Sequence, residues 1–272
     1  MAGSTSITKL LGDQAQLKYL LKNLHRTRGW AFWAAWAQRA TGVLLLLYVW
    51  LHIITLSGLS QPDKFNSQMK IFGFIFFVVL EWLLAIPVIY HALNGGRLIL
   101  YEIFQIRKEE ILLKWVMVLG GAYTVLLAFF MIIGNQEVSA TFFWVYMAAA
   151  SACIVYITIR KLKVSGASFF WKLQRISGVY LLLMIPAHML FMHLSPDMGH
   201  EAQTIIERMG HPFIKIVDFS LIVSALYHGA YGIYSISQDY ITSFKVQIGV
   251  VVLLSCVTLF FTWTGLKLVI MI

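Results

Sequence analysis

The sequence predicts an all-α membrane protein with about seven transmembrane helices. Of its 272 residues, 60% are hydrophobic and only 12% are charged, and a soluble domain of this length cannot bury so much apolar surface. Several apolar runs approach or exceed the ~18 residues that cross a bilayer as a helix. One sequence pattern also occurs twice, 136 residues apart, which indicates two related halves.

The predicted spans follow the apolar runs, and the basic residues orient them. In chain order the spans cover residues 34–57, 71–94, 113–134, 140–159, 168–194, 212–236 and 246–270. Sixteen of the 21 Lys and Arg residues precede or open the first span, or lie between spans two and three, four and five, or six and seven or within the first turns of spans three and five. Because cytoplasmic loops are enriched in Lys and Arg, we expect a cytoplasmic N-terminus and an external C-terminus. The net charge of +9 follows from this asymmetry, so no nucleic-acid partner is inferred.

The two halves predict four segments along the chain. Residues 1–33 form a polar cytoplasmic N-terminal extension with no signal-peptide core. Its stretch "QLKYLLKNLHR" fits either an amphipathic helix against the membrane or a partner, or a simple topological anchor. The first repeat is 34–134 and the second is 161–272. Both start on the cytoplasmic side, so the repeats are parallel and a linking span within 135–160 must cross between them.

The repeat contains four histidines inside predicted spans. "QRATG" at Gln38 and "QRISG" at Gln174 are each followed by a histidine at the same distance. At an offset of 137, a second set corresponds: His91, Gly95 and Glu102 with His228, Gly232 and Asp239. Polar side chains are costly in hydrocarbon and mark functional positions there. Four histidines at repeat-related positions therefore indicate a site built by both halves.

The depths of the histidines sort them into two pairs. His52 lies thirteen residues beyond Arg39, about 20 Å along a helix axis, and the repeat gives His188 the same depth. These two form the predicted outer pair, while His91 and His228, nearer the cytoplasmic ends of their spans, form the inner pair. Two layers with one histidine from each half predict two bis-histidine haems stacked across the membrane, with the four histidines as ligands of the haem iron.

Small and polar residues on the same helices form the predicted haem environment. Gly95 and Gly232 lie four residues after the inner histidines, where a missing side chain leaves space for a porphyrin. Thr41 and Ser177 lie eleven residues before the outer histidines, about 20° off the same helix face. Arg175 completes this set. His193, five residues beyond the second outer histidine, is the alternative outer ligand.

Three motifs resemble the membrane-anchor (cytochrome b) subunits of succinate dehydrogenase and fumarate reductase. "YHALNGGRLILYE" at 90–102 resembles the second span of the larger anchor subunit, and "QRATG" resembles the opening of its first span. "YHGAYGIYSISQDY" at 227–240 resembles the haem-binding span of the smaller anchor subunit. The chain is thus similar to the two anchor subunits fused in their usual order, and its outer pair resembles the two-haem members of the family.

This resemblance implies a role for each site. The inner pair would ligate one haem b, and Arg39, Asp239 and Tyr240 would form a quinone site near the iron–sulfur subunit. Ala35 stands where the family has a quinone-site serine. The chain would carry electrons through two haems b to ubiquinone or menaquinone in a bacterial or archaeal cytoplasmic membrane. A flavoprotein subunit with FAD and an iron–sulfur subunit would dock on the cytoplasmic face and perform the dicarboxylate chemistry.

Three other function classes fit parts of the pattern. A cytochrome b anchor of a hydrogenase or a formate dehydrogenase would have the same haems but partners without FAD. A parallel-repeat transporter would also contain buried polar residues but would lack a Soret band. A purely structural anchor would contain no haem. Within the succinate dehydrogenase family, both succinate oxidation and fumarate reduction fit the sequence.

Overall fold

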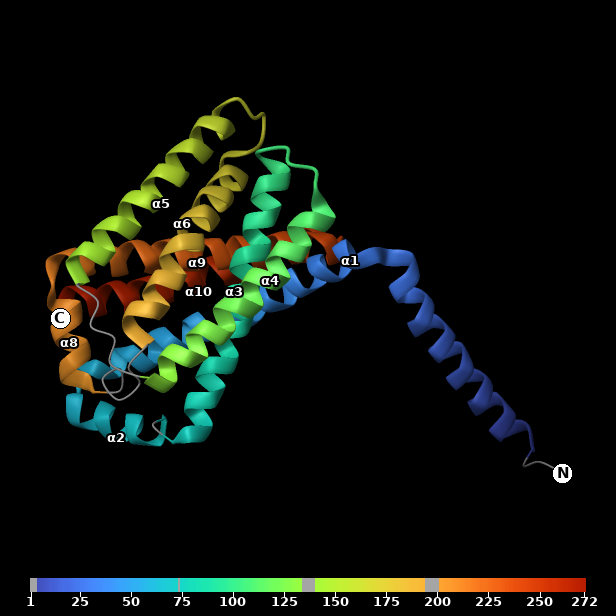
Figure 1. Ribbon diagram of the computed structural model, residues 1–272, viewed down its shortest axis with the longest axis horizontal. Helices are drawn as coiled ribbons and strands as arrows, with labels where there is room; N and C mark the ends of the chain where they lie inside the picture. Colours follow the sequence, from blue (N-terminus) through green and yellow to red (C-terminus); the bar gives the residue numbers. More distant parts are fainter. Residues whose placement is uncertain (1–3, 73, 134–139, 194–200) are drawn as a thin grey trace. The chain divides into compact units, whose positions relative to one another are not determined.

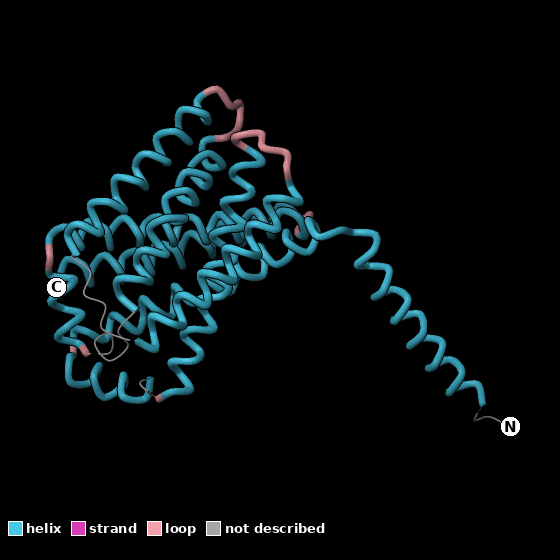
Figure 2. Tube along the Cα trace, in the orientation of Figure 1, coloured by secondary structure: helices cyan, strands magenta, loops and turns pink. Residues whose placement is uncertain are grey.

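The predicted all-helical class and the seven predicted spans are confirmed. The computed structural model describes residues 4–72, 74–133, 140–193 and 201–272, and these are helical apart from short turns (Figures 1 and 2). Seven helices in the described part of the chain are long and apolar enough to cross a membrane.

The chain divides into two compact units, Met1–Ala37 and Gln38–Ile272. The helices in order are α1 (Ser4–Ser57), the short 3₁₀ helix η1 (Gly58–Ser60), α2 (Pro62–Phe72), α3 (Ile75–Glu102), α4 (Glu109–Ile133), α5 (Ala140–Lys163), α6 (Phe169–His193), α8 (Ala202–Gly210), α9 (Pro212–Tyr240) and α10 (Phe244–Met271). The first unit contains the N-terminal part of α1, whose helical geometry is broken at Gly29 (φ 62°, ψ 169°). Glycine adopts this left-handed φ without the steric cost that other residues pay. The stretch "QLKYLLKNLHR" has a helical backbone, and its side chains lie outside the described residues.

Several helices extend further than the predicted spans, as α3 and α4 illustrate. The second span was expected to end at residue 94, but α3 continues to Glu102, and α4 already begins at Glu109 rather than at residue 113. About 20 residues cross the hydrocarbon core, so a helix of 28 residues reaches into the headgroup region. Charged residues are tolerated in that last stretch because they are paired: Arg97 Nη1 lies 2.7 Å from Glu109 Oε1.

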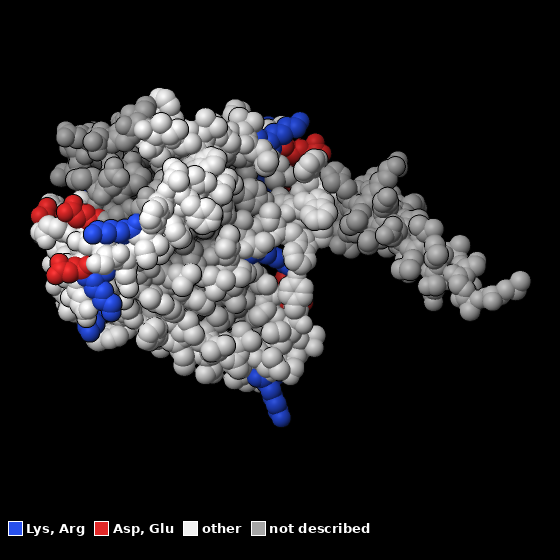
Figure 3. Space-filling view, turned by 90° about the horizontal axis from the view of Figure 1, so that it is seen from below, with Lys and Arg blue, Asp and Glu red and all other residues white. Residues whose placement is uncertain are grey.

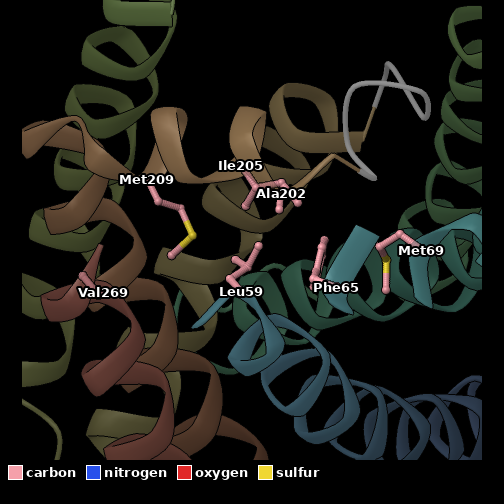
Figure 4. Close-up of a cluster of buried hydrophobic side chains, with 7 residues drawn as sticks. All are labelled: Leu59, Phe65, Met69, Ala202, Ile205, Met209 and Val269. Carbon is pink, nitrogen blue, oxygen red and sulfur yellow. The ribbon is translucent and has the colours of Figure 1, made fainter. Parts of the chain in front are cut away.

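The repeat appears in the fold as two sets of four helices. In chain order the part of α1 beyond residue 37, with α2, α3 and α4, matches α6, α8, α9 and α10 at the sequence offset of the repeat, and α5 lies between the two sets. The short amphipathic helices α2 and α8, which the sequence analysis did not predict, contact each other through one apolar cluster (Figure 4). Its buried members are Leu59, Phe65, Met69, Ala202, Ile205, Met209 and Val269. Asn66 Oδ1 also accepts a hydrogen bond of 2.8 Å from the backbone N–H of Ala202 at the start of α8.

Helix α6 occupies a central position in the second unit. It packs against α3, α5 and α9, while α4 packs on α3 and α10 packs on α9. The outward faces remain apolar, with large exposed side chains such as Trp115, Leu253 and Trp263. On the face shown in Figure 3, charged side chains gather toward two ends and leave a broad uncharged surface between them. Apolar surface of this extent is typical of contact with lipid.

Candidate functional site: two histidine pairs and their supports

The four repeat-related histidines lie in two pairs, and each pair joins the two halves. The rings of His91 on α3 and His228 on α9 have centroids 6.3 Å apart and planes at 89°. The rings of His52 on α1 and His188 on α6 have centroids 6.4 Å apart and planes at 88°. A metal–imidazole bond is about 2 Å long and the ring centre lies about 1 Å beyond the nitrogen, so two axial imidazoles on one metal have centroids about 6 Å apart. Both pairs therefore fit two-histidine ligation of a haem iron.

The motif that opens the first repeat holds the inner histidine of its own half. His91 Nδ1 lies 3.2 Å from the backbone carbonyl oxygen of Gln38 and 3.1 Å from Thr41 Oγ1. A carbonyl oxygen only accepts hydrogen bonds, so Nδ1 carries the proton and donates it. The neutral ring then presents Nε2 without a proton, which is the form that ligates a metal.

The second repeat builds the same support around His228. Its Nδ1 lies 3.3 Å from the carbonyl oxygen of Gln174 and 3.4 Å from Ser177 Oγ. Ser177 Oγ also donates to that carbonyl, at 3.0 Å. The repeated Gln-Arg-x-Thr/Ser-Gly pattern thus has a structural reason, because in each half it orients an imidazole about 50 residues further along the chain.

The glycines that end these motifs leave room for the imidazole rings. A Cβ atom on Gly42 would lie 3.0 Å from His91 Cε1, and one on Gly178 would lie 2.9 Å from His228 Cε1. Ordinary carbon contacts are about 3.5–4.0 Å. A side chain at either position would therefore press directly on the ring of an inner histidine.

The structure relates the predicted haem-environment residues to the inner histidines. Thr41 and Ser177 were selected for their spacing to the outer histidines, and their hydroxyls lie beside the inner ones instead. Gly95 and Gly232 face the side-chain amides of the motif glutamines, since their added Cβ atoms would lie 3.4 Å and 3.9 Å from these nitrogens. Gln38 and Gln174 were recognised in the sequence only as members of the repeat, although their carbonyls hold the rings.

The motif arginines form ion pairs that cross between the halves. Arg39 of the first half lies 2.6 Å from Asp239 of the second, and Arg175 of the second half lies 2.7 Å from Glu102 of the first. The Arg175 guanidinium also stacks over the Trp171 ring, with its carbon 4.6 Å from the ring centroid. The two carboxylates correspond in the repeat, so the exchange is reciprocal and ties both halves together around the inner pair.

The predicted quinone residues come together in one cluster. Besides its ion pair with Asp239, Arg39 donates a hydrogen bond of 3.2 Å from Nη1 to the Tyr240 hydroxyl. Arg39 and Asp239 have 39% and 50% of their side-chain surface exposed, and Tyr240 is exposed as well. The cluster is therefore open to a ligand and to solvent or a docked protein.

The outer pair has an aromatic neighbour. The Tyr48 ring stacks on His52, with centroids 5.5 Å apart. The geometry brings His52 and His188 together, whereas the side chain of His193, the alternative ligand, lies outside the described residues.

Comparison with known proteins identifies the family. The sequence profile described as the succinate dehydrogenase/fumarate reductase transmembrane subunit matches residues 20–130 and 158–262, well over half of the chain. The stretch between the matched segments contains most of α5. Neither the curated proteins nor the solved structures include a significant match. The chain therefore belongs to the succinate dehydrogenase/fumarate reductase transmembrane subunit family and is a multi-pass membrane anchor of that complex.

Proposed function

We propose that the chain is a dihaem cytochrome b anchor that passes electrons between the iron–sulfur centres of a succinate:quinone oxidoreductase and membrane quinone. The observation that carries this proposal is the pairing of four histidines across the halves, with centroids 6.3 Å and 6.4 Å apart. Two histidines from one half and two from the other would supply the ligands of two haem irons, one in each layer.

The ligand set favours electron transfer over chemistry at the iron. A haem b held by two of these histidines would supply a one-electron carrier rather than a site for oxygen binding. Residues of this chain determine how the ligating imidazoles are oriented. The carbonyls of Gln38 and Gln174 accept hydrogen bonds from the Nδ1–H groups, which fixes the tautomer and the orientation of both inner imidazoles.

The Arg39, Asp239 and Tyr240 cluster is the proposed quinone site. The Tyr240 hydroxyl and the Arg39 guanidinium are hydrogen-bond donors suited to a quinone carbonyl oxygen. Asp239 orients the guanidinium through the 2.6 Å ion pair. Either ubiquinone or menaquinone presents the carbonyl that these donors recognise.

The partners follow from the family and from the charge asymmetry. An anchor of this complex associates with the catalytic subunits, which we assign as an FAD-containing flavoprotein and an iron–sulfur protein. The excess of Lys and Arg between alternate spans orients the Arg39 cluster toward the cytoplasm. The partners would dock on that face, and the dicarboxylate reaction would take place in them.

Purification of the tagged chain with its native partners tests this function. We expect a Soret band, bound FAD and iron, and succinate:quinone activity in the same complex. A complex without a Soret band would instead support a transporter or a structural anchor. A complex with a Soret band whose partners lack FAD and succinate activity would support an anchor for a hydrogenase or a formate dehydrogenase.

A further inference from the structure

A chain of polar side chains joined by hydrogen bonds runs from the backbone of one inner histidine to the start of the next helix, α4. Gln38 Nε2 donates to the carbonyl oxygen of His91 (3.2 Å), and Asn94 Nδ2 donates to Gln38 Oε1 (2.9 Å). Arg97 Nε donates to Asn94 Oδ1 (2.8 Å) while its Nη1 donates to Glu109 Oε1 (2.7 Å). The chain thus connects α1, α3 and the first turn of α4.

The middle of this chain is withdrawn from solvent. Asn94 is fully buried and Arg97 is 4% exposed, whereas 39% of the Glu109 side chain is accessible. Burial of a guanidinium is costly unless its donors are used, and here two of its nitrogens have charge-assisted partners. Each bond in the chain fixes the next side chain. Arg97 holds the Asn94 amide, Asn94 holds the Gln38 side chain, and the backbone carbonyl of Gln38 orients the His91 ring.

Among the described residues of the second half there is no equivalent hydrogen-bond chain. At the repeat offset of 137, Tyr231 and Tyr234 stand in place of Asn94 and Arg97. Correspondingly, Gln174 Oε1 is buried without a hydrogen-bond partner among the described residues. The two inner histidines therefore make similar hydrogen bonds to their motif carbonyls. In the described part of the chain, only His91 is additionally supported by a network that contains a buried positive charge, that of Arg97.

We propose that Arg97 is a positioning residue that tunes the inner haem from one side. This inference rests on the proposed haem function and adds two effects to it. Through Asn94 and Gln38, Arg97 fixes the orientation of His91, and its buried positive charge favours the ferrous over the ferric state. Arg97 lies six residues beyond His91, about 9 Å along the helix axis, where a charge in a low-dielectric interior remains effective.

Three substitutions distinguish the effect of the Arg97 charge from its effect on the orientation of the His91 ring. Arg97→Gln removes the charge and should lower the midpoint potential of the inner haem and shift its low-spin EPR signal. Arg97→Lys keeps the charge but not both hydrogen bonds, so it should shift the EPR signal while the potential changes less. Glu109→Gln removes the neighbouring negative charge and should raise the potential. Tyr234→Phe, at the equivalent position of the second half, is the matched control and should leave both readouts as in wild type.

The haem content of the wild-type complex is measured first, because a complex without haem would refute the proposed function and not this inference alone. If wild type holds its haems, an inner-haem potential and EPR signal that are unchanged in Arg97→Gln would overturn the role of Arg97. If Arg97→Gln does not assemble, the comparison of Arg97→Lys with Glu109→Gln decides. Equal potentials and wild-type EPR signals in those two variants would be the contradicting result.

Discussion

Gly178→Ala tests whether the repeated motif shapes the inner haem site. The added Cβ would lie 2.9 Å from His228 Cε1, whereas ordinary contacts begin at 3.4 Å, so the ring must move by about 0.5 Å. The ring cannot move freely, because its Nδ1 is held by the Gln174 carbonyl. Overpacking of this kind costs about 1–3 kcal/mol. If the strain falls on ligation, haem retention weakens roughly 5- to 150-fold.

The assay is the haem-to-chain ratio after detergent dilution, together with the low-spin EPR signal of the inner haem. Near-perpendicular axial imidazoles leave two iron d orbitals almost degenerate, which gives a strongly anisotropic signal that ring rotation changes. Gly42→Ala should act in the same direction, with a starting contact of 3.0 Å. Gly121→Ala on α4 is the control, since its Cβ would meet nothing within 4 Å. Wild-type haem retention and an unaltered inner signal in Gly178→Ala would refute the reasoning.

Three further predictions address the outer haem, the quinone site and the topology. His52→Ala or His188→Ala should remove one haem and leave the inner haem spectrally intact, which optical and EPR spectra check; loss of both haems would count against separate layers. Tyr240→Phe removes only the hydroxyl that accepts from Arg39, so it should strongly lower succinate:quinone activity while succinate oxidation by an artificial acceptor continues. Unchanged quinone turnover would exclude Tyr240 from the site. A reporter fused after Lys163 should read cytoplasmic and one after Gln136 external, and same-side readings would contradict the crossing of α5.

The spans could be predicted because every helix that crosses a bilayer needs about 20 mostly apolar residues, and the apolar runs of the sequence have this length. The helix ends could not be placed as well. Charged residues such as Arg97 normally mark the end of an apolar run, yet α3 continues beyond it because Glu109 of the next helix neutralises the charge. That partner belongs to a different helix, and a hydropathy pattern does not reveal it.

The site could be predicted in part for a similar reason. The four histidines were selected by the repeat and paired by their depth along the helices. Both inferences need only the spacing of residues in the sequence. The helical angle related Thr41 to His52, but packing of α1 beside α3 brings its hydroxyl to His91. The role of Gln38 was missed because the contacting atom is its backbone carbonyl, which carries no sequence signal. The meeting of Arg39 and Asp239 was predicted through the quinone site. The ion pair between Arg175 and Glu102 was missed, because spacing along the sequence does not show that these side chains of opposite halves are in contact.

The most direct test of the central claim is the number of haems per chain. Pyridine haemochrome on the purified complex, divided by the chain concentration from amino-acid analysis, gives this ratio. The two histidine pairs, with centroids 6.3 Å and 6.4 Å apart, predict two haems b per chain and two distinct low-spin EPR signals. A ratio of one haem per fully assembled chain, with a single signal that persists in His52→Ala, would contradict the account of the outer pair. A ratio of zero would contradict both pairs.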